Sequence, residues 1–491
     1  MDNSQNTFQN AGNVAQVPSG TVPPVQQAPP TPAPMGNTNV VTVGNPSEKP
    51  PGSFSAGKKI IKIFLGLIFI LAVISVVIFI AISKAQESLP GKGFVSFWGI
   101  WEDARVVQVI INDYEKQNPG VKISYTKQDI KQYRESLTVR IDNGTGPDIF
   151  TYHNTWYPMI LSVLSPFPAN VISKEEFAKT FYPVAQKDLI KNGAIYGVPF
   201  AVDTLVMYIN TDLFKSAGVA VPTTWNDFMS AARVLTVKDE NGKIKTAGAA
   251  MGTYDNINYA PDILSLLFLQ NGADLNDINS HKERVEGALN FYTSFAADSD
   301  NVWDDTLDPS LLAFSKGNLA MYFGYSWDYF SIKKFNSNLS FQVVPVPQLA
   351  DQPINLASYW ALGVSSKTQY QKEAFDFIKY FMSKEVQQKL YAEESKERDF
   401  GQPHARVDLA QSLSNNPNVY PFVLQAPTAH SSYFVDGTND NGLNQQLNTY
   451  LGDAVRSMYK GGSSEAAFDT LLEGITPVLQ QYGIVGQELK P

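Results

Sequence analysis

The chain of 491 residues contains no cysteine and only four histidines, His153, His281, His404 and His430. Without cysteine there can be no disulfide framework, thiolate metal site, iron–sulfur cluster, cysteine nucleophile or lipid-modified cysteine. No two histidines have the spacing of a metal site on one helix face, and the glycine-rich motifs of nucleotide-binding loops are missing. Gly324-Tyr325-Ser326-Trp327 lacks the second glycine of a nucleophile elbow. We therefore expect no cofactor, no metal and no catalytic residue of these kinds.

Positive charge is also in short supply. Lys and Arg number 38 against 47 Asp and Glu, so the formal net charge is −9. Sequence-independent binding to nucleic acid needs a basic face, and we expect no nucleic-acid partner. The apolar content of 44% is ordinary, but it is divided among unlike regions: residues 1–57, 58–83 and 93–491, with a short linker at 84–92.

Residues 1–57 have the composition of a disordered tail. They contain 10 of the chain's 30 prolines and only three charged residues, Asp2, Glu48 and Lys49. Such a segment buries too little apolar surface to offset the entropy that folding would cost. The run Pro29-Pro30-Thr31-Pro32 is typical of a ligand for polyproline-binding domains. An inert tail is the alternative that we favour.

A long uncharged run follows the tail. The 20 residues from Ile63 to Ile82 carry no charge. At ~1.5 Å rise per residue, a helix of this length spans the ~30 Å hydrocarbon core of a bilayer. Four lysines precede the run and two follow it closely, which favours a cytoplasmic N-terminus. A cleaved signal peptide is the alternative, but the apolar run is too long for one and a 57-residue tail precedes it. We predict a single-pass transmembrane helix within 58–83 and an extracellular domain at 93–491.

The outer region begins with alternating strand and helix patterns. Residues 94–98 and 121–125 have the character of strands, and a third strand opens at 147–150. Between the first two, an i, i+3, i+4, i+7 stripe predicts a helix through Val107, Ile110, Ile111 and Tyr114. This order predicts a parallel sheet covered by helices, with ligands outside the carboxyl ends of its strands. Because 399 residues exceed what one core usually holds, we predict two lobes.

Four stretches resemble the bacterial extracellular solute-binding proteins, family 1, which are the maltose-binding-like receptors of ABC importers. They are F-W-G at 97–99, G-T-G-P-D-I-F at 144–150, I-Y-G-V-P at 195–199 with D-T-L at 203–205 and Y-I-N-T-D-L-F at 208–214, and F-S-K-G-N-L-A-M at 314–321. Their order and spacing are similar to the family's from residue 93 to about 382. The last hundred residues match only loosely.

This resemblance implies an α/β fold with two lobes joined by hinge strands, the type II periplasmic-binding-protein-like fold, with the solute bound between the lobes. Lobe one would be about 93–202 plus 350–425, and lobe two about 206–348 plus 430–491. The chain would cross between lobes near 199–205, 344–353 and 425–435. Family members are usually free or anchored by a lipidated cysteine, so the transmembrane helix would replace that anchor here.

The resemblance also implies which residues contact the solute. Trp98 follows the first strand, and Tyr152, Asn154 and Trp156 follow the G-P-D strand, where the family's first two ligand loops lie. Asp203 occupies the position of a sugar-hydroxyl acceptor, and Trp327 that of a stacking ring, with Tyr325 as its competitor. Further candidates are Tyr254, Asn256, Tyr359, Trp360, Tyr433 and Asp436. Packing in a core or hinge is the alternative for these side chains, and Asp148 is expected to buttress its turn.

Aromatic residues beside Asp, Asn and Gly in loops are typical of a non-catalytic cleft for small polar molecules. We therefore predict a membrane-tethered receptor that captures a sugar or similar polar solute and delivers it to an ABC transporter permease. The first alternative is a membrane-anchored glycan-processing enzyme, whose carboxylate pair would stand ~5–9.5 Å apart across the cleft. The second is an envelope scaffold with a vestigial cleft.

Overall fold

The computed structural model describes residues 93–297, 300–435 and 442–485. The predicted tail, the transmembrane run from Ile63 to Ile82, the linker and the candidate Asp436 lie outside these residues. Within the part of the chain that is described, no helix is long and apolar enough to cross a membrane.

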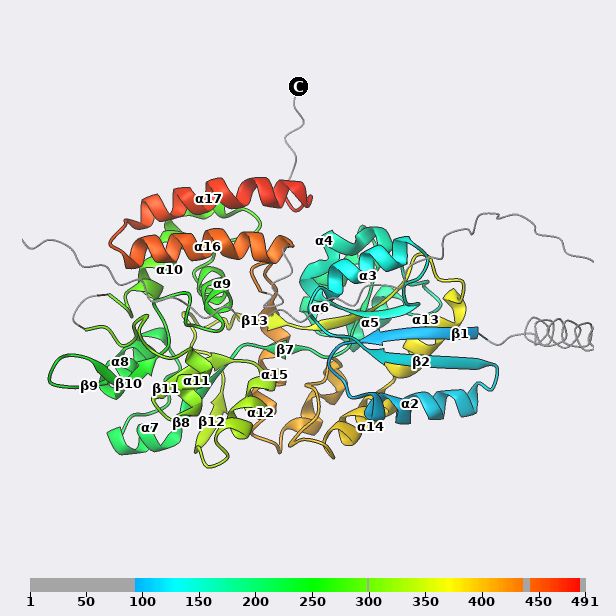
Figure 1. The fold of residues 1–491 in the computed structure, drawn as a ribbon, viewed down its shortest axis with the longest axis horizontal. Coiled ribbons are helices and arrows are strands. Elements are labelled where there is room, and N and C mark those ends of the chain that lie inside the picture. The colour runs from blue at the N-terminus through cyan, green and yellow to red at the C-terminus, as the bar shows by residue number, and fades with distance from the viewer. Residues whose placement is uncertain (1–92, 298–299, 436–441, 486–491) are drawn as a thin grey trace, which may run out of the picture. The chain divides into compact units, whose positions relative to one another are not determined.

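The first sheet has the strand order β2-β1-β3-β14-β6 (Figure 1). Its strands are β1 (Gly93–Gly99), β2 (Val121–Lys127), β3 (Ile149–His153), β6 (Val198–Pro199) and β14 (Trp360–Val364). β1 pairs in parallel with β2 and β3, and parallel neighbours need crossover connections, which α2 (Ala104–Gln117) and α3 (Tyr133–Asp142) supply. The predicted stripe Val107, Ile110, Ile111 and Tyr114 is the buried face of α2. The β-α-β-α-β prediction is confirmed for these three strands, but β14 pairs antiparallel with both β3 and β6, so the sheet is mixed and not purely parallel as predicted.

The first hydrophobic core surrounds this sheet and defines lobe one. Its other helices are α4 (Tyr157–Ile160), α5 (Lys174–Thr180), α6 (Pro183–Leu189), α13 (Gln371–Phe381) and α14 (Lys384–Glu394), and β4 (Ile190–Lys191) pairs with β5 (Ala194–Ile195). Phe97 of β1 packs edge-on against Phe377 and Phe381 of α13, with ring centroids 6.2 Å apart in both pairs. The late helix α13 is thereby part of the core that the first strand begins.

The second sheet has the order β12-β8-β11-β10-β9 and lies in lobe two. Its strands are β8 (Val206–Asn210), β9 (Val237–Lys238), β10 (Ile244–Ala249), β11 (Leu319–Gly324) and β12 (Phe341–Val344). A turn joins β9 to β10, where Asp239 Oδ1 accepts hydrogen bonds from the backbone nitrogens of Asn241 and Lys243, both 3.0 Å away. Gly242 supplies the left-handed backbone that the turn requires, with φ 78°.

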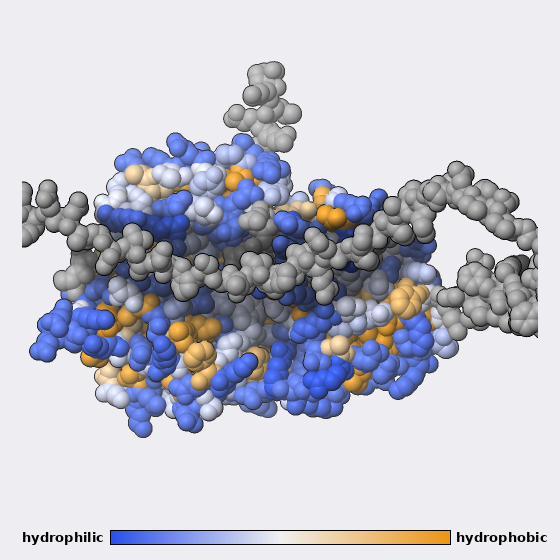
Figure 2. Space-filling model, in the orientation of Figure 1, coloured by the Kyte–Doolittle hydropathy of each residue, from blue (hydrophilic) through white to orange (hydrophobic). Residues whose placement is uncertain are grey.

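Helices complete the core of lobe two. They are α7 (Thr211–Ala217), α8 (Trp225–Leu235), α9 (Ala260–Gln270), α10 (Lys282–Thr293), α11 (Ser310–Ser315), α12 (Ser326–Phe335), α16 (Leu443–Tyr459) and α17 (Ser464–Gln481). Of these, α16 and α17 form an outer layer that packs on other helices of the lobe. Thr224 caps α8, because its hydroxyl accepts from the Asp227 nitrogen at 3.2 Å. The face in Figure 2 is mostly hydrophilic, with separate apolar patches.

A three-stranded sheet, β15-β13-β7, connects the lobes. Its strands are β7 (Asp203–Thr204), β13 (Asn355–Ser358) and β15 (Ala429–His430). Val202 packs in the first core and Leu205 in the second, and the chain changes core again between Leu356 and Ala357. A further change lies between Ala429 and Phe434. The crossing at Leu356–Ala357 thus lies beyond the predicted 344–353, whereas the other two lie within the predicted 199–205 and 425–435.

The stretch 350–425, expected in lobe one, contributes to both cores. Phe400, Leu413, Val419 and Phe422 are buried in the second core, and α15 (Tyr420–Gln425) begins among them. The ring of Phe400 lies 5.0 Å from Tyr329 and 4.7 Å from Phe330, both on α12. The segment leaves lobe one because its apolar side chains find their buried contacts on lobe two.

Candidate functional site

Asp203 lies on β7, an edge strand of the connecting sheet, opposite Ser358 of the central strand β13. Its side chain is 4% exposed. Asp203 Oδ2 accepts from the Ser326 backbone nitrogen at 3.0 Å and from the Ser326 hydroxyl, and Oδ1 accepts from the Thr204 nitrogen at 2.9 Å. Burial raises the pKa of Asp203 to about 7, although these hydrogen bonds oppose the increase. The carboxylate ties β7 to the first residue of α12.

An aromatic platform follows Ser326. Trp327 is 39% exposed, and one face of its indole stacks on Tyr325, with ring centroids 4.6 Å apart and planes at 19°. Tyr325 is buried, and its hydroxyl donates to Asp262 Oδ1 at 2.6 Å. Tyr325 is thus the base of the platform and Trp327 its accessible layer. The last residue of β11 is Gly324, and a larger residue would not fit there, because its Cβ would meet the Asp328 carboxylate and the Tyr322 ring.

A second aromatic group gathers at the carboxyl ends of β1 and β3 in lobe one. The Trp360 ring makes edge contacts with Trp101 at 5.5 Å, His153 at 5.3 Å and Trp156 at 5.2 Å. Trp101 is 44% exposed, whereas Trp156 is fully buried beneath Trp360. The sequence analysis missed Trp101. The rule that ligands lie beyond the carboxyl ends of strands could have found it, because β1 ends at Gly99.

The connecting sheet brings the two aromatic groups to one place in the fold. His153 Nε2 lies 3.0 Å from the hydroxyl of Ser358, which is two residues before Trp360. Ser358 pairs with Asp203, and Asp203 binds Ser326, the residue before Trp327. The exposed rings of Trp101 and Trp327 therefore belong to groups that flank the same pair of hinge strands.

Asp188 is a half-buried carboxylate that the sequence analysis also missed. It accepts from Asn154 Nδ2 at 2.9 Å, from the Tyr359 hydroxyl at 2.8 Å and from the Ser431 hydroxyl. Burial raises its pKa, and the three donors oppose that increase. Asn154 and Tyr359 are themselves buried. Both were predicted to contact the solute, and in the structure both donate a hydrogen bond to Asp188 instead.

Several other predicted site residues pack within a lobe. Tyr152 is fully buried, and its hydroxyl donates to the Tyr196 carbonyl at 3.3 Å. Trp98 is half-buried, with the Arg140 guanidinium 5.5 Å above its ring. These contacts are those of the packing alternative.

The lobe-two candidates have comparable internal partners. Asn256 Oδ1 accepts from Trp303 Nε1 at 3.1 Å, and the Tyr254 hydroxyl donates to the Asn448 carbonyl at 2.8 Å. The carbonyl of the half-buried Tyr433 accepts from Asn444 Nδ2 at 2.8 Å. None of these contacts involves Trp101 or Trp327.

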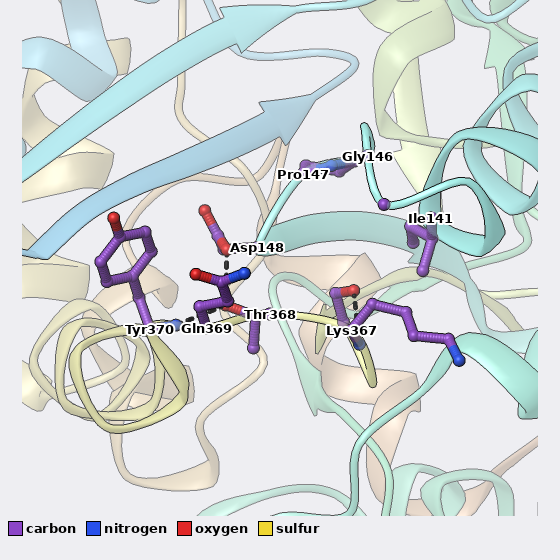
Figure 3. Close-up of a pocket in the computed structure, with 10 residues that line it drawn as sticks. Ile141, Gly146, Pro147, Asp148, Lys367, Thr368, Gln369 and Tyr370 are labelled. Atoms are coloured by element: carbon purple, nitrogen blue, oxygen red, sulfur yellow. Dashed lines mark hydrogen bonds between the residues drawn. The ribbon is translucent and has the colours of Figure 1, made fainter.

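A separate shallow pocket lies at the start of β3, at the opposite end of the first sheet from the aromatic group (Figure 3). Asp148 faces Thr368 there and accepts from its hydroxyl. The same carboxylate accepts from the Ser96 nitrogen and hydroxyl, each at 2.7 Å. Asp148 therefore buttresses the turn, as expected from the sequence. No group of three or more metal-ligating side chains occurs among residues 93–297, 300–435 and 442–485.

Comparison with known proteins identifies a family whose model matches more than half of the chain. The model of the family described as "Bacterial extracellular solute-binding protein" matches residues 101–388. A multiple sugar-binding protein of Streptococcus mutans is 23% identical over 338 residues, which are 63% of this chain and 76% of the relative. A maltooligosaccharide ABC transporter solute-binding lipoprotein of Streptococcus pneumoniae is 24% identical over 300 residues, covering 58% and 67% of the two chains.

Solved structures share the fold. A cyclo/maltodextrin-binding protein complexed with maltotetraose superposes with a TM-score of 0.65 at 17% identity, covering 80% of this chain and 99% of that one. A cyclic α-maltosyl-1,6-maltose binding protein from Arthrobacter globiformis gives a TM-score of 0.66 at 18% identity, covering 80% and 100%. Both support the two-lobed α/β fold predicted from the sequence.

Proposed function

This chain belongs to the family of bacterial extracellular solute-binding proteins, and from that membership we propose that it binds a saccharide between its lobes and delivers it to an ABC transporter permease. The observation that carries the saccharide is the pair of exposed tryptophans, Trp101 and Trp327, each backed by a second ring beside the hinge. Flat aromatic faces stack on the apolar faces of sugar rings. The names of the relatives support the same solute class.

Members of this family bind solutes and are not enzymes, so the glycan-processing alternative finds no support. The buried and half-buried carboxylates beside the aromatic groups also have structural partners. Asp188 and Asp203 each accept from three groups, and Asp328 accepts from the hydroxyls of Tyr259 and Tyr322. A catalytic carboxylate needs oxygen lone pairs directed at substrate, and these are largely occupied.

We extend the proposal to the lobe boundaries and to closure. Lobe one would be about 93–202 plus 350–425, and lobe two about 206–348 plus 430–491. Within 400–425, several apolar side chains pack in the core of lobe two, as described above. The short strands of the connecting sheet, β7, β13 and β15, can absorb a change in backbone angles while the two cores move as rigid bodies. The lining residues would be Trp101 and Trp327, with Trp360, Asp203 and the other predicted candidates at the hinge.

Binding should stabilise the full-length chain without turnover. In a thermal-shift screen with maltotetraose, mannobiose and tagatose, one saccharide should raise the melting temperature, because a ligand at 100 times Kd adds about 2.7 kcal/mol to folding. Chromatography after long incubation should recover the saccharide intact. The chain lacks cysteine, so spin labels at Glu135→Cys and Glu240→Cys should report a change in the distance between lobes in the same titration. Conversion of the saccharide would favour the enzyme, and failure of every saccharide to bind would favour the scaffold.

We also propose that the run from Ile63 to Ile82 anchors the chain, with the N-terminus cytoplasmic and the domain outside. Relatives that are lipoproteins show one way to hold such a domain at a membrane, and this chain has no cysteine for that route. Protease added to intact cells should digest residues 93–491 and leave a tag at the N-terminus protected. Recovery of a mature chain that starts near Lys84 would contradict an uncleaved anchor.

A further inference from the structure

We infer that Tyr259 is the positioning residue that fixes the ring plane of Trp327, so that the indole offers a single face to a sugar. The inference rests on the proposed function. Tyr259 immediately precedes α9 and is 68 residues from Trp327 in sequence. Its hydroxyl accepts a hydrogen bond from Trp327 Nε1 at 2.7 Å, and this bond fixes one edge of a partly exposed ring.

The Tyr259 hydroxyl is a chemically matched bridge. It accepts from the indole nitrogen, which can only donate, and it donates to Asp328 Oδ1 at 3.1 Å. Asp328 is the residue after Trp327 on α12. The side chains of Trp327, Tyr259 and Asp328 therefore form a closed ring of contacts with the α12 backbone. A phenylalanine at position 259 could not complete this ring of contacts, because it lacks the hydroxyl that makes both hydrogen bonds.

The bridge is itself rigidly held. Asp328 Oδ2 accepts from the Tyr322 hydroxyl at 3.1 Å and from the Tyr325 nitrogen at 3.0 Å. The Tyr259 ring packs edge-on against Tyr325, with centroids 5.1 Å apart at 82°. A ring fixed before binding loses no rotamer freedom when the ligand arrives, and this preorganisation increases affinity.

The arrangement also selects the kind of solute. Tyr325 covers one face of Trp327 at 4.6 Å, and Tyr259 holds the indole nitrogen. What remains is one open apolar face of fixed direction. A pyranose ring, which has a flat face of C–H groups, fits such a surface, whereas a solute that is polar on every side gains little from it.

The test compares Tyr259→Phe with Tyr322→Phe in the full-length chain. Each variant removes one hydroxyl that donates to Asp328 over a distance of 3.1 Å. Of the two hydroxyls, Tyr259 is the one that accepts the hydrogen bond from Trp327 Nε1. With all seven tryptophans replaced by 5-fluorotryptophan, the Trp327 signal in ¹⁹F NMR can be assigned with Trp327→Phe. Tyr259→Phe should shift and broaden that signal, and Tyr322→Phe should leave it nearly unchanged. Maltotetraose affinity should fall about five- to tenfold for Tyr259→Phe, as for one lost hydrogen bond, and less than about twofold for the control.

The two proposals fail in different ways. An unchanged Trp327 signal in Tyr259→Phe overturns the positioning role whether or not any sugar binds. A changed signal with undiminished maltotetraose affinity overturns its importance for recognition. If the parent chain does not bind maltotetraose, the proposed function is contradicted for that glycan, and the NMR comparison alone decides whether Tyr259 orients the ring. Equal loss of signal in both variants would assign the effect to Asp328 instead, and would also overturn the inference.

Discussion

Replacing Trp101 and Trp327 together by alanine is expected to weaken saccharide binding about a hundredfold, while the melting temperature of the free protein changes little. The rings are 44% and 39% exposed, so much of their surface is free to stack on a ligand. Truncating a stacking ring costs ~1–2 kcal/mol of binding, and each 1.4 kcal/mol is a factor of ten. Isothermal titration of the double variant against the parent measures the loss, and the single variants apportion it between the lobes.

Phe335→Ala is the matched control, because Phe335 is a 68% exposed ring at the far end of α12. It should change neither affinity nor melting temperature. If the double variant binds like the parent, the exposed tryptophans are not stacking platforms. A large fall in melting temperature with unchanged affinity would instead assign them the packing role that the sequence left open.

The free energy of unfolding of Asp203→Asn, relative to the parent, is expected to depend strongly on pH. Burial raises the pKa of Asp203 to about 7, against ~3.9 for an unfolded aspartate. The folded parent therefore retains a proton that the unfolded chain releases, which stabilises it below pH 4 and progressively less as the pH rises to 7. At 1.36 kcal/mol per pH unit, the ionised carboxyl costs about 4 kcal/mol by pH 8, of which about 1.5 kcal/mol is already lost at pH 5. Asparagine is neutral throughout, so the variant should gain about 2.5 kcal/mol relative to the parent between pH 5 and 8.

Comparison with the parent at each pH is necessary because other buried groups titrate in the same range. Burial also raises the pKa of Asp328 to about 7, which adds to the loss of stability with pH. His404 acts in the opposite direction below pH 6.5, since burial lowers its pKa to about 4. Urea unfolding at pH 5, 6, 7 and 8 measures the difference, and Asp142→Asn, an exposed change at the end of α3, should give a constant difference. A constant difference for Asp203→Asn as well would contradict the buried carboxylate.

Asp203 illustrates the limit of a family resemblance. Its position pointed to a sugar-hydroxyl acceptor, but three hydrogen bonds already occupy the carboxylate, two of them from Ser326, 123 residues away. Contact with ligand through a remaining lone pair stays a prediction. The same holds for Asn154 and Tyr359, whose partner Asp188 also binds Ser431 across 243 residues. Nothing in the local sequence of these residues indicates such partners.

The sequence by itself determined the features that depend on neighbouring residues. The apolar stripe of α2, the Thr224 cap and the Asp239 turn each involve residues within a few positions, so a local pattern is sufficient to predict them. The alternation of strands and helices likewise determined the parallel pairing of β1 with β2 and β3, whereas the antiparallel addition of β14 and β6 to that sheet was not predicted. Only the tertiary structure decided which aromatic rings are exposed. Trp101 meets Trp360, and Tyr259 holds Trp327, through contacts between distant segments whose approach depends on how the two cores and the hinge strands pack.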